Sequence, residues 1–400
     1  MLTEKAREIP VTGEYDVAVC GGGTAGIAAA LAAARNGAKT ILVEREYTLG
    51  GLATLGLVII YLPICSDDGH QVSYSIAEEL MRLSVKNGTG LYKSGKPGSK
   101  YSTAEMDLSR ERCHLKFNPN IFAVNAESLL IENGVTVLYG TSVCACDVRD
   151  GSIGHIITEN RDGRCAIKVK SVVDATGDAL ICRAAGEDTV DFSQGNVPAS
   201  WYICFDDGIE KLRQIGFADI PDEQKTPEQL EADKAAYRVS GRGAMEVSEL
   251  TIYSHKKAIE DFLKSGTDSP SHRLAALAGI PQLRMTRRIS GAYTQNDDEI
   301  GRHYTDSVGM FCDWRKPGPV YELPFSCLHG KKVKNLLAAG RCISSTDAMW
   351  DITRVIPVCA VSGQAAGTAA AMFTDMHNAD ISALQYRLRC DGVKLHEDEI

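Results

Sequence analysis

Residues 15–26, Tyr-Asp-Val-Ala-Val-Cys-Gly-Gly-Gly-Thr-Ala-Gly, decide the fold of this chain. Residues 15–20 form a short apolar run that ends at a glycine cluster, which predicts a buried strand. The alanine-rich residues 24–36 predict a helix that ends near Asn36-Gly37, and residues 39–44 predict a second strand. A strand, a helix and a strand in so short a stretch predict two parallel strands joined by a right-handed crossover.

The glycines after the first predicted strand have the spacing G-x-G-x-x-G, at Gly21, Gly23 and Gly26. The first permits a tight turn, the second lets the backbone approach a pyrophosphate, and the third lets the helix pack closely on the strand. Phosphates would then lie at the helix N-terminus, where free N–H groups favour negative charge. Glu44 ends the second strand, where it can accept hydrogen bonds from ribose hydroxyls and would repel the 2′-phosphate of NADP. The unit predicts nucleotide binding by Gly21, Gly23, Thr24, Ala25, Gly26, Glu44 and Arg45.

The composition predicts a globular, cytoplasmic protein. Of the 400 residues, 44% are hydrophobic, and 43 basic against 52 acidic residues give a net charge of −9, which argues against a nucleic-acid partner. The longest apolar run, residues 55–65, is too short to cross a bilayer, so we expect no membrane partner. The 13 cysteines include no C-x-x-C pair, and residues 1–16 lack the apolar segment of a secretory signal. Free thiols in this number are typical of a reducing compartment.

The pattern along the chain predicts an α/β fold with a Rossmann-like domain assembled from separate segments. We expect helices at 73–87, Pro119–Glu132 and 357–373, a surface loop at 88–100, and strands at 135–139, 142–148, 153–159, 165–174 and 335–339. The charged residues 222–234 and a helix at about 248–265 set the stretch 190–280 apart. The expected division is a nucleotide-binding domain at 1–65, 115–189 and 281–385, a helical and loop excursion at 66–114, an inserted α+β substrate or cap domain at 190–280, and a peripheral tail at 386–400.

Three further pieces of sequence accompany the glycine loop. Gly50-Gly51 follows the second predicted strand in LGGLATLG, and residues 171–178, SVVDATGD, predict a strand that ends in Ala-Thr-Gly-Asp. Residues 335–341, NLLAAGR, precede the segment 354–367, RVIPVCAVSGQAAG. In the helix predicted there, Pro357 suits the first turn, where its missing N–H costs nothing. The small residues of that helix predict a face that another element can approach closely.

Together these pieces resemble the FAD-binding domain of the glutathione-reductase-like flavoproteins. The details GGLAT, RMTRRISG and AGRCIS resemble the broad FAD-dependent oxidoreductase family related to fumarate-reductase-type flavoproteins. The resemblance implies that the second glycine pair lines the pyrophosphate, that ATGD closes over the cofactor, and that the start of the final helix faces the flavin pyrimidine. The cofactor contacts expected beyond the first unit are Gly50, Gly51, Val143, Ala175, Thr176, Gly177, Asp178, Gly340, Arg341, Pro357, Gly363, Gln364, Ala365 and Ala366.

The same resemblance implies that the FAD is bound without a covalent link. Covalent relatives often use a histidine soon after the glycine pair, and residues 52–56 of this chain contain none. The implied function is transfer of a hydride between flavin N5 and a small organic substrate, which the arginines below suggest is anionic.

Residues 282–289, QLRMTRRI, carry three arginines that can bind an anion. Arg284 and Arg288 would share one face of either a strand or a helix, and co-facial guanidinium groups suit a carboxylate or a phosphate. Arg354 is a second candidate, because in fumarate-reductase-like relatives arginines bind a dicarboxylate and one donates a proton. Our hypothesis places Arg288 and Arg354 on the substrate side of the flavin. The alternative is that these arginines join the domains through acidic partners. His329 is a further candidate acid or base.

Two other classes of protein remain open at this point. One is a non-redox or sensor-type flavoprotein that only holds its nucleotide, and the other is an NAD-dependent dehydrogenase. The chain has no second complete glycine loop and no redox C-x-x-C, so the electron donor or acceptor stays unknown. No metal site is expected, because the sequence shows no clustered ligands. A homodimer is common for such folds, and the oligomeric state stays open.

Overall fold

The first strand-helix-strand unit forms the middle of a mixed sheet. The computed structural model describes residues 2, 6–67, 69–87, 90–94, 100–102, 112–216, 225–234 and 237–400. In this part of the chain seven strands pair in the order β10-β11-β12-β1-β2-β9, with β20 beside β12. Their bounds are β1 Val11–Cys20, β2 Thr40–Val43, β9 Thr136–Leu138, β10 Ser142–Arg149, β11 Ser152–Asn160, β12 Gly163–Asp174 and β20 Leu336–Ala338. The α/β fold with parallel strands at its centre is confirmed.

The parallel strands of this sheet end level with one another. Cys20 of β1 pairs with both Val43 of β2 and Asp174 of β12, and Asp174 pairs with Ala338 of β20. The residues that follow these strand ends directly are Gly21, Glu44, Ala175 and Ala339, which begin the glycine loop, the segment toward Gly50-Gly51, the Ala-Thr-Gly-Asp turn and the Ala-Gly-Arg segment. The register therefore gathers them at the carboxyl edge of the sheet, where open α/β sheets bind their ligands.

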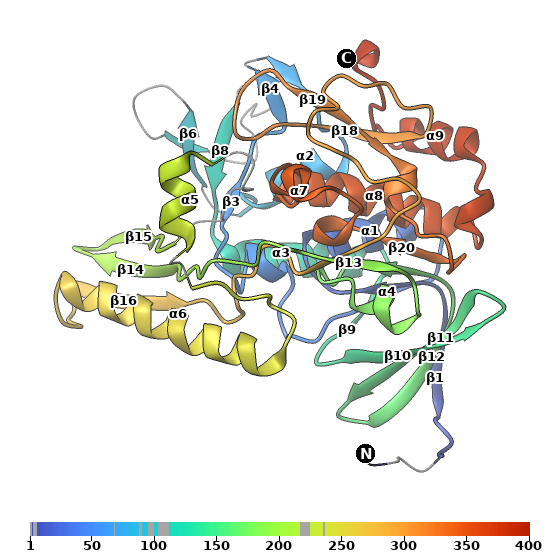
Figure 1. Cartoon of the computed structure of the whole chain (residues 1–400), viewed down its shortest axis with the longest axis horizontal. Helices are drawn as coiled ribbons and strands as arrows, with labels where there is room; N and C mark the ends of the chain where they lie inside the picture. The colour runs from blue at the N-terminus through green and yellow to red at the C-terminus, as the bar shows by residue number, and fades with distance from the viewer. Residues whose placement is uncertain are drawn as a thin grey trace.

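Two helices packed on each other lie over the centre of the sheet (Figure 1). They are α1, Thr24–Arg35, and α8, Ile356–Met372, and both are almost entirely buried. A Cβ on Gly363 would lie 2.3 Å from the carbonyl oxygen of Ala25, and one on Gly367 would lie 2.1 Å from that of Ala29. Only glycine permits this approach. Because the contacts advance together along both helices, the two helices run parallel.

The remaining helices border this core. They are α2 Ile76–Leu83, α3 Pro119–Glu132, α4 Leu180–Ala184, α7 Asp347–Thr353 and α9 Ile381–Cys390, with short 3-10 turns at Gly51–Ala53, Phe325–Cys327, Gly340–Cys342, Met376–Asn378 and Glu397–Glu399. The side chain of Asn118 accepts hydrogen bonds from the amides of Asn120 and Ile121, which explains why α3 begins where the sequence predicts. No single helix among the described residues is long and apolar enough to cross a membrane. One pair, α7 with α8, passes that test only together and is bent by 91°.

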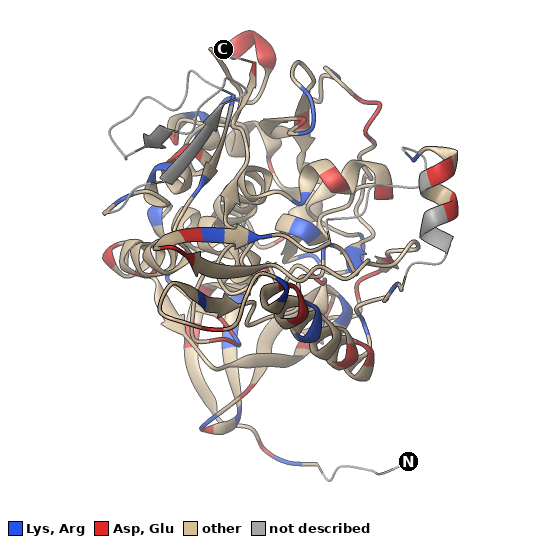
Figure 2. Ribbon diagram, turned by 90° about the vertical axis from the view of Figure 1, so that its left-hand side faces the viewer, with Lys and Arg blue, Asp and Glu red and all other residues tan. Residues whose placement is uncertain are grey.

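A second small sheet forms between β13, Thr189–Asp191, and β17, Arg287–Ile289. These two strands pair antiparallel and bring together the two ends of the intervening segment. Within it, β14 Tyr202–Asp206, β15 Ile209–Arg213 and β16 His272–Leu277 form a sheet of order β15-β14-β16. Helix α6, Ala244–Lys264, lies across this sheet, and α5, Pro227–Lys234, lies nearby (Figure 1). Figure 2 shows basic and acidic residues mixed along α6.

Two expectations about the periphery need correction. The excursion at 66–114 also contains strands. Some of them belong to a sheet of order β3-β8-β6-β7, whose strands are β3 Ile60–Tyr61, β6 Gly90–Ser94, β7 Lys100–Ser102 and β8 Cys113–Lys116. The others form the short pair β4 Cys65–Asp67 and β5 His70–Gln71. The expected surface loop therefore carries two strands, and its residues 88–89 and 95–99 lie outside the described residues.

The tail is not wholly peripheral either. Leu388 and Leu395 are fully buried in the main core. They pack there because α9 lies near the hairpin of β18, Ser307–Cys312, and β19, Val320–Pro324 (Figure 1). The leucines of this segment are isolated among charged residues, so the segment as a whole is polar in sequence. This polarity led to the expectation of a peripheral tail.

Candidate active site

The loop between β1 and α1 needs glycine at two positions for close backbone contact. Gly21 has φ +105°, and a Cβ on it would lie 2.6 Å from the carbonyl oxygen of Ala175. A Cβ on Gly26 would lie 1.8 Å from the carbonyl oxygen of Gly21. By contrast, a Cβ on Gly23 would have no atom within 4 Å. The loop is thus in close backbone contact at Gly21 and Gly26, and it leaves open space beside Gly23.

The first turn of α1 offers hydrogen-bond donors that no described group uses. Gly23, at the N-cap, has no side chain to cap the helix, and the first helical amide with an acceptor is that of Ile27, bonded to the carbonyl of Gly23. Thr24 and Ala25 are buried, so water does not readily replace the missing acceptor. A buried, uncapped helix start fits a phosphate group. The residues present therefore fit the pyrophosphate of a dinucleotide.

Glu44 is held in place directly below this loop. One carboxylate oxygen accepts a hydrogen bond from the amide of Gly22 at 2.5 Å, and the other accepts one from the amide of Glu46 at 2.8 Å. A carboxylate has about four lone-pair positions, so acceptors remain for ribose hydroxyls. The neighbouring Arg45 is exposed and pairs with Glu46 at 3.3 Å.

The second glycine pair lies against the first loop. The amide of Gly50 donates to the carbonyl of Gly22 at 2.8 Å, and a Cβ on Gly51 would lie 3.2 Å from Cα of Gly23. The start of β10 also approaches this edge, because the amide of Thr141 donates to the carbonyl of Glu44 at 3.0 Å. Val143, two residues further along β10, is half-buried.

The residues after β12 turn around a buried carboxylate, that of Asp174 at the end of the strand. Asp174 accepts hydrogen bonds from the amides of Thr176, Ile181 and Cys182 and from the hydroxyl of Thr176. Burial raises the pKa of Asp174, against the effect of these bonds. The carboxylate thereby fixes the path of the Ala-Thr-Gly-Asp segment. Its signal in the sequence is the acidic residue at the end of an otherwise apolar strand.

Beyond this turn, Asp178 pairs with Arg341 at 3.3 Å. The same guanidinium donates to the carbonyls of Leu283 and Arg284 at 3.0 and 2.8 Å. Gly177, with φ +77°, leaves room for it, since a Cβ there would lie 2.5 Å from Nη2 of Arg341. Arg341 therefore anchors the segment before β17 to the carboxyl edge of the sheet.

The start of α8 comes close to the start of α1. A Cβ on Gly340 would lie 2.7 Å from Cβ of Ala25 and 3.6 Å from Sγ of Cys359, so Gly340 sits between the two first turns. Gly363 contacts Ala25, but Gly363 is the eighth residue of α8 whereas Ala25 is only the second residue of α1, a difference of six residues. At the helical rise, α8 thus begins about 9 Å before α1 does. Pro357 lies in its first turn, and no side chain caps it.

The small residues further along α8 face protein. Gly363 contacts α1, and Ala365 and Ala366 are fully buried. The side chain of Gln364 accepts a hydrogen bond from the amide of Ile76 at 3.1 Å and donates to the hydroxyl of Ser75 at 2.8 Å, so it caps α2. Gly363, Gln364, Ala365 and Ala366 therefore contact protein and position the first turns of α1, α2 and α8.

Arg284 and Arg354 form a buried cationic site just beyond the start of α8. Arg284 is 5% exposed, and its guanidinium lies 5.0 Å from the ring centre of Trp201. The guanidinium of Arg354 lies at the same distance over Trp350 and pairs with Asp351. In the part of the chain that the structure describes, the buried Nε atom of each arginine lacks a hydrogen-bond acceptor. Burial and the charges of Arg354 and Arg341 lower the pKa of Arg284 to about 9.

Arg288 has a different set of neighbours. Its Nη1 donates to the carbonyl of Ile289 at 3.2 Å and to the hydroxyl of Ser344 at 3.3 Å. Burial lowers its pKa, and the charges that act on it are those of Asp347 and Cys327. Because β17 begins only at Arg287, Arg284 lies outside the strand and does not share a strand face with Arg288. The structure thus groups Arg284 with Arg354 and Arg341.

His329 is buried among aromatic rings. Its Nδ1 lies 3.0 Å from the carbonyl of Gly330, and the rings of Phe325 and His377 are its neighbours. Burial lowers the pKa of His329, so the ring is neutral at pH 7. The site residues that sequence reasoning missed are Trp201 and Trp350. They carry no spacing signal, and only their rarity, three tryptophans in the chain, sets them apart.

Comparison with known proteins agrees with this geometry. Residues 16–202 and 205–388 match the model of the family described as FAD dependent oxidoreductase. A stretch of 71 residues is 38% identical to a thioredoxin reductase of Ureaplasma parvum serovar 3, and covers 18% of this chain and 23% of that protein. This chain therefore matches about a quarter of the length of that curated relative.

Two solved structures are among those that this chain matches at low sequence identity. A geranylgeranyl bacteriochlorophyll reductase-like protein from Thermoplasma acidophilum superposes with a TM-score of 0.47 at 14% identity, over 94% of this chain and 83% of the other. The open conformation of a flavocytochrome c3 fumarate reductase gives a TM-score of 0.44 at 14% identity, over 90% of this chain and 79% of the other.

Proposed function

The chain belongs to the FAD-dependent oxidoreductase family, and from that premise we propose that it oxidises or reduces a small anionic substrate bound by Arg284 and Arg354. When bound, FAD supplies the redox chemistry by donating or accepting a hydride at N5. The protein supplies binding, orientation and charge. The residues that would hold FAD are the open amides of Thr24 and Ala25, the carboxylate of Glu44 and the first turn of α8.

The observation that carries the proposal is the excess positive charge around Arg284. Arg341 pairs with Asp178, Arg354 pairs with Asp351, and Arg315 pairs with Asp313. Arg284 is the member of this group that forms no ion pair among the described residues, and the carboxylate of Asp351, which pairs with Arg354, acts on it only from a distance. A buried cation without a partner costs several kcal/mol, which a bound anion would offset. A guanidinium suits a carboxylate because it can donate two parallel hydrogen bonds.

The position of this site relative to the helix also favours the proposal. Arg354 lies just before Val355, the N-cap of α8, and the start of α8 extends beyond that of α1, whose loop would hold the phosphates. The dipole of α8 would favour negative charge at that point. Trp201 and Trp350 cover the two guanidinium groups and exclude water, which strengthens their interaction with an anion.

Arg284 is also our candidate for moving a proton. Its lowered pKa, about 9, makes the guanidinium a stronger acid than an exposed arginine. We infer that its N–H groups hold a proton toward the substrate atom next to the carbon that gains or loses the hydride, so that hydride and proton add to, or leave from, two adjacent atoms. The alternative role, joining domains through acidic partners, suits Arg341, which bonds Asp178 and two carbonyls.

The experiment compares Arg284→Gln with Arg287→Gln. Arg287 lies three residues further along the chain, at the start of β17, and pairs with Asp191 at 2.9 Å, so it controls for loss of an arginine nearby. The flavin content of each purified variant is measured after acid release, and the flavin is then tested under anaerobic conditions. Saturated and hydroxy carboxylates are tried as reductants, and unsaturated carboxylates as oxidants.

We expect Arg284→Gln to keep its flavin and to lose at least about tenfold in turnover with the best carboxylate, since hydrogen bonds to charged groups contribute about 1.5–3 kcal/mol. Arg287→Gln should behave as the wild type. Arg284→Lys, which keeps the charge, should recover part of the loss. Equal turnover in Arg284→Gln and the wild type would remove Arg284 from the proposal.

A further inference from the structure

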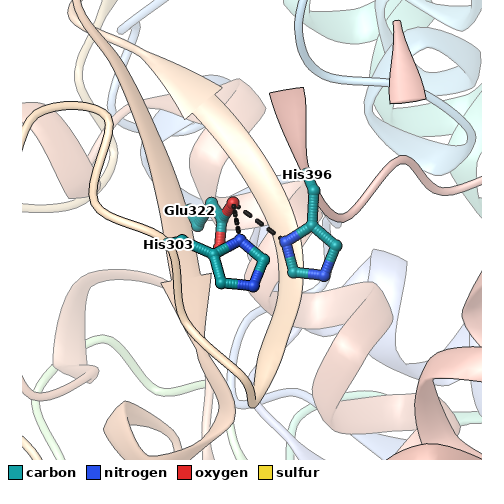
Figure 3. Close-up of side chains that lie close together, drawn as sticks. All are labelled: His303, Glu322 and His396. Atoms are coloured by element: carbon teal, nitrogen blue, oxygen red, sulfur yellow. Dashed lines mark hydrogen bonds and ion pairs between the residues drawn. The ribbon is translucent and has the colours of Figure 1, made fainter. Parts of the chain in front are cut away.

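We propose that His303, Glu322 and His396 form a binding site for one Zn²⁺ ion. The ligand atoms of the three side chains lie within 4.8 Å of one another (Figure 3). One oxygen of Glu322 lies 2.9 Å from Nδ1 of His396 and 3.4 Å from Nδ1 of His303. The two imidazole rings flank that oxygen, with ring centres 4.3 Å apart. This inference does not depend on the substrate proposed above.

Two of the three separations between ligand atoms approach those around a tetrahedral zinc ion, and all three are within 4.8 Å. Zn–N and Zn–O bonds of about 2.0–2.2 Å place neighbouring ligand atoms about 3.3 Å apart. The separation of 3.4 Å from His303 already fits, and that of 2.9 Å from His396 needs to widen by only a few tenths of an ångström. Two imidazoles with one carboxylate are typical zinc ligands, whereas Mg²⁺ and Ca²⁺ prefer oxygen ligands alone.

The buried members of the site are held by their surroundings. The second oxygen of Glu322 accepts a hydrogen bond from the amide of Tyr304 at 2.7 Å, which fixes the plane of the carboxylate. The carbonyl of Leu395 accepts a hydrogen bond from Ser307 at 2.7 Å, which fixes the residue before His396. Such second contacts orient metal ligands and raise their affinity.

The third ligand gives access. The side chain of His303 is 65% exposed, so an ion can enter from solvent and keep a water molecule at a fourth position. Glu397 and Asp398 follow His396 directly and add negative charge at this edge of the molecule, whereas Glu399 pairs with Arg389 at 2.8 Å. Zinc would link the loop before β18, the strand β19 and the C-terminal segment, which are distant in the sequence.

The test is a zinc titration of the intact flavoprotein after treatment with a chelator. Free zinc is followed by a competing chromophoric indicator. We expect one equivalent to bind per chain, and Zn²⁺ to raise the midpoint of thermal unfolding by mass action. His303→Ala should weaken binding by more than about 100-fold, because loss of second contacts alone costs about 10- to 100-fold.

His155→Ala is the matched control, since His155 contacts Asp147 at 3.1 Å without a second histidine, and it should bind zinc as the wild type does. The exposed His303 can be replaced without risk to the core, so a folded variant is assured. Anomalous diffraction at the zinc edge should place the ion against Glu322. A wild type that takes up no stoichiometric zinc, or an unchanged affinity in His303→Ala, would overturn the proposal and leave a hydrogen-bonded cluster.

Discussion

Arg284 is the residue on which the pH dependence of this protein should turn. Its pKa is lowered to about 9 by burial and by its cationic neighbours. Below that pH the guanidinium is charged and binds an anion, and above it the charge is lost. We predict that the dissociation constant of a small carboxylate for the oxidised flavoprotein rises about tenfold for each pH unit above about 9.

The measurement is a carboxylate titration between neutral and alkaline pH, with a flavin spectrum recorded at each step. A bound anion raises the pKa of Arg284, so the turning point should move upward as the ligand saturates. Arg284→Gln should bind weakly at every pH and show no such turning point. If the dissociation constant of the carboxylate still rose above about pH 9 in Arg284→Gln, a group other than Arg284 would cause the loss of binding at alkaline pH.

Single residues also show where prediction from the sequence stops. The glycine spacing indicated three backbone approaches, and the structure shows two of them as contacts that a Cβ would block. The pairing of Arg284 with Arg288 was based on a regular element, but the chain is irregular until Arg287. The grouping of Arg284 with Arg354 needs the fold, as does the approach of His303 to His396. No spacing in a sequence encodes such contacts between distant segments.

At the scale of elements, the contact between α1 and α8 positions the site. Gly363 lies against the carbonyl of Ala25, in the turn that would bind phosphate, whereas Gly367 lies one turn further from it. We predict that Gly363→Ala and Gly367→Ala each destabilise the protein by about 1–3 kcal/mol through overpacking. Gly363→Ala alone should also weaken FAD binding, because it displaces the first turn of α1.

Thermal unfolding and FAD titration of the apoprotein measure the two effects separately. Gly154→Ala is the control, since a Cβ there would have only contacts of 4.0 Å, and it should change neither quantity. If Gly363→Ala and Gly367→Ala weakened FAD equally, the contact would act on stability alone. The long helices α1, α2, α3, α6 and α8 were predictable to within a few residues, because their periodicity and caps are local properties, whereas α4, α5, α7 and α9 were not predicted.

At the scale of the whole molecule, the register of the strands determines which distant segments of the chain meet at one edge of the sheet. It brings Cys20, Val43, Asp174 and Ala338 to one level and so joins four distant pieces of sequence into one edge. The sequence predicted this edge through the order of its motifs. It did not predict the sheet of β3, β6, β7 and β8, whose short strands have composition typical of loops, nor the buried face of the C-terminal segment.

An anion site next to a bound flavin is the central feature proposed for this protein, and a spectral titration with carboxylates tests for it. Purified wild-type protein, with its FAD, is titrated with small mono- and dicarboxylates and with matching uncharged alcohols while the flavin absorption spectrum is recorded. We predict that at least one carboxylate shifts the spectrum saturably, that the alcohols do not, and that Arg284→Gln loses the shift while keeping its flavin. A spectrum that no carboxylate changes, or one that the alcohols change equally, would contradict the account.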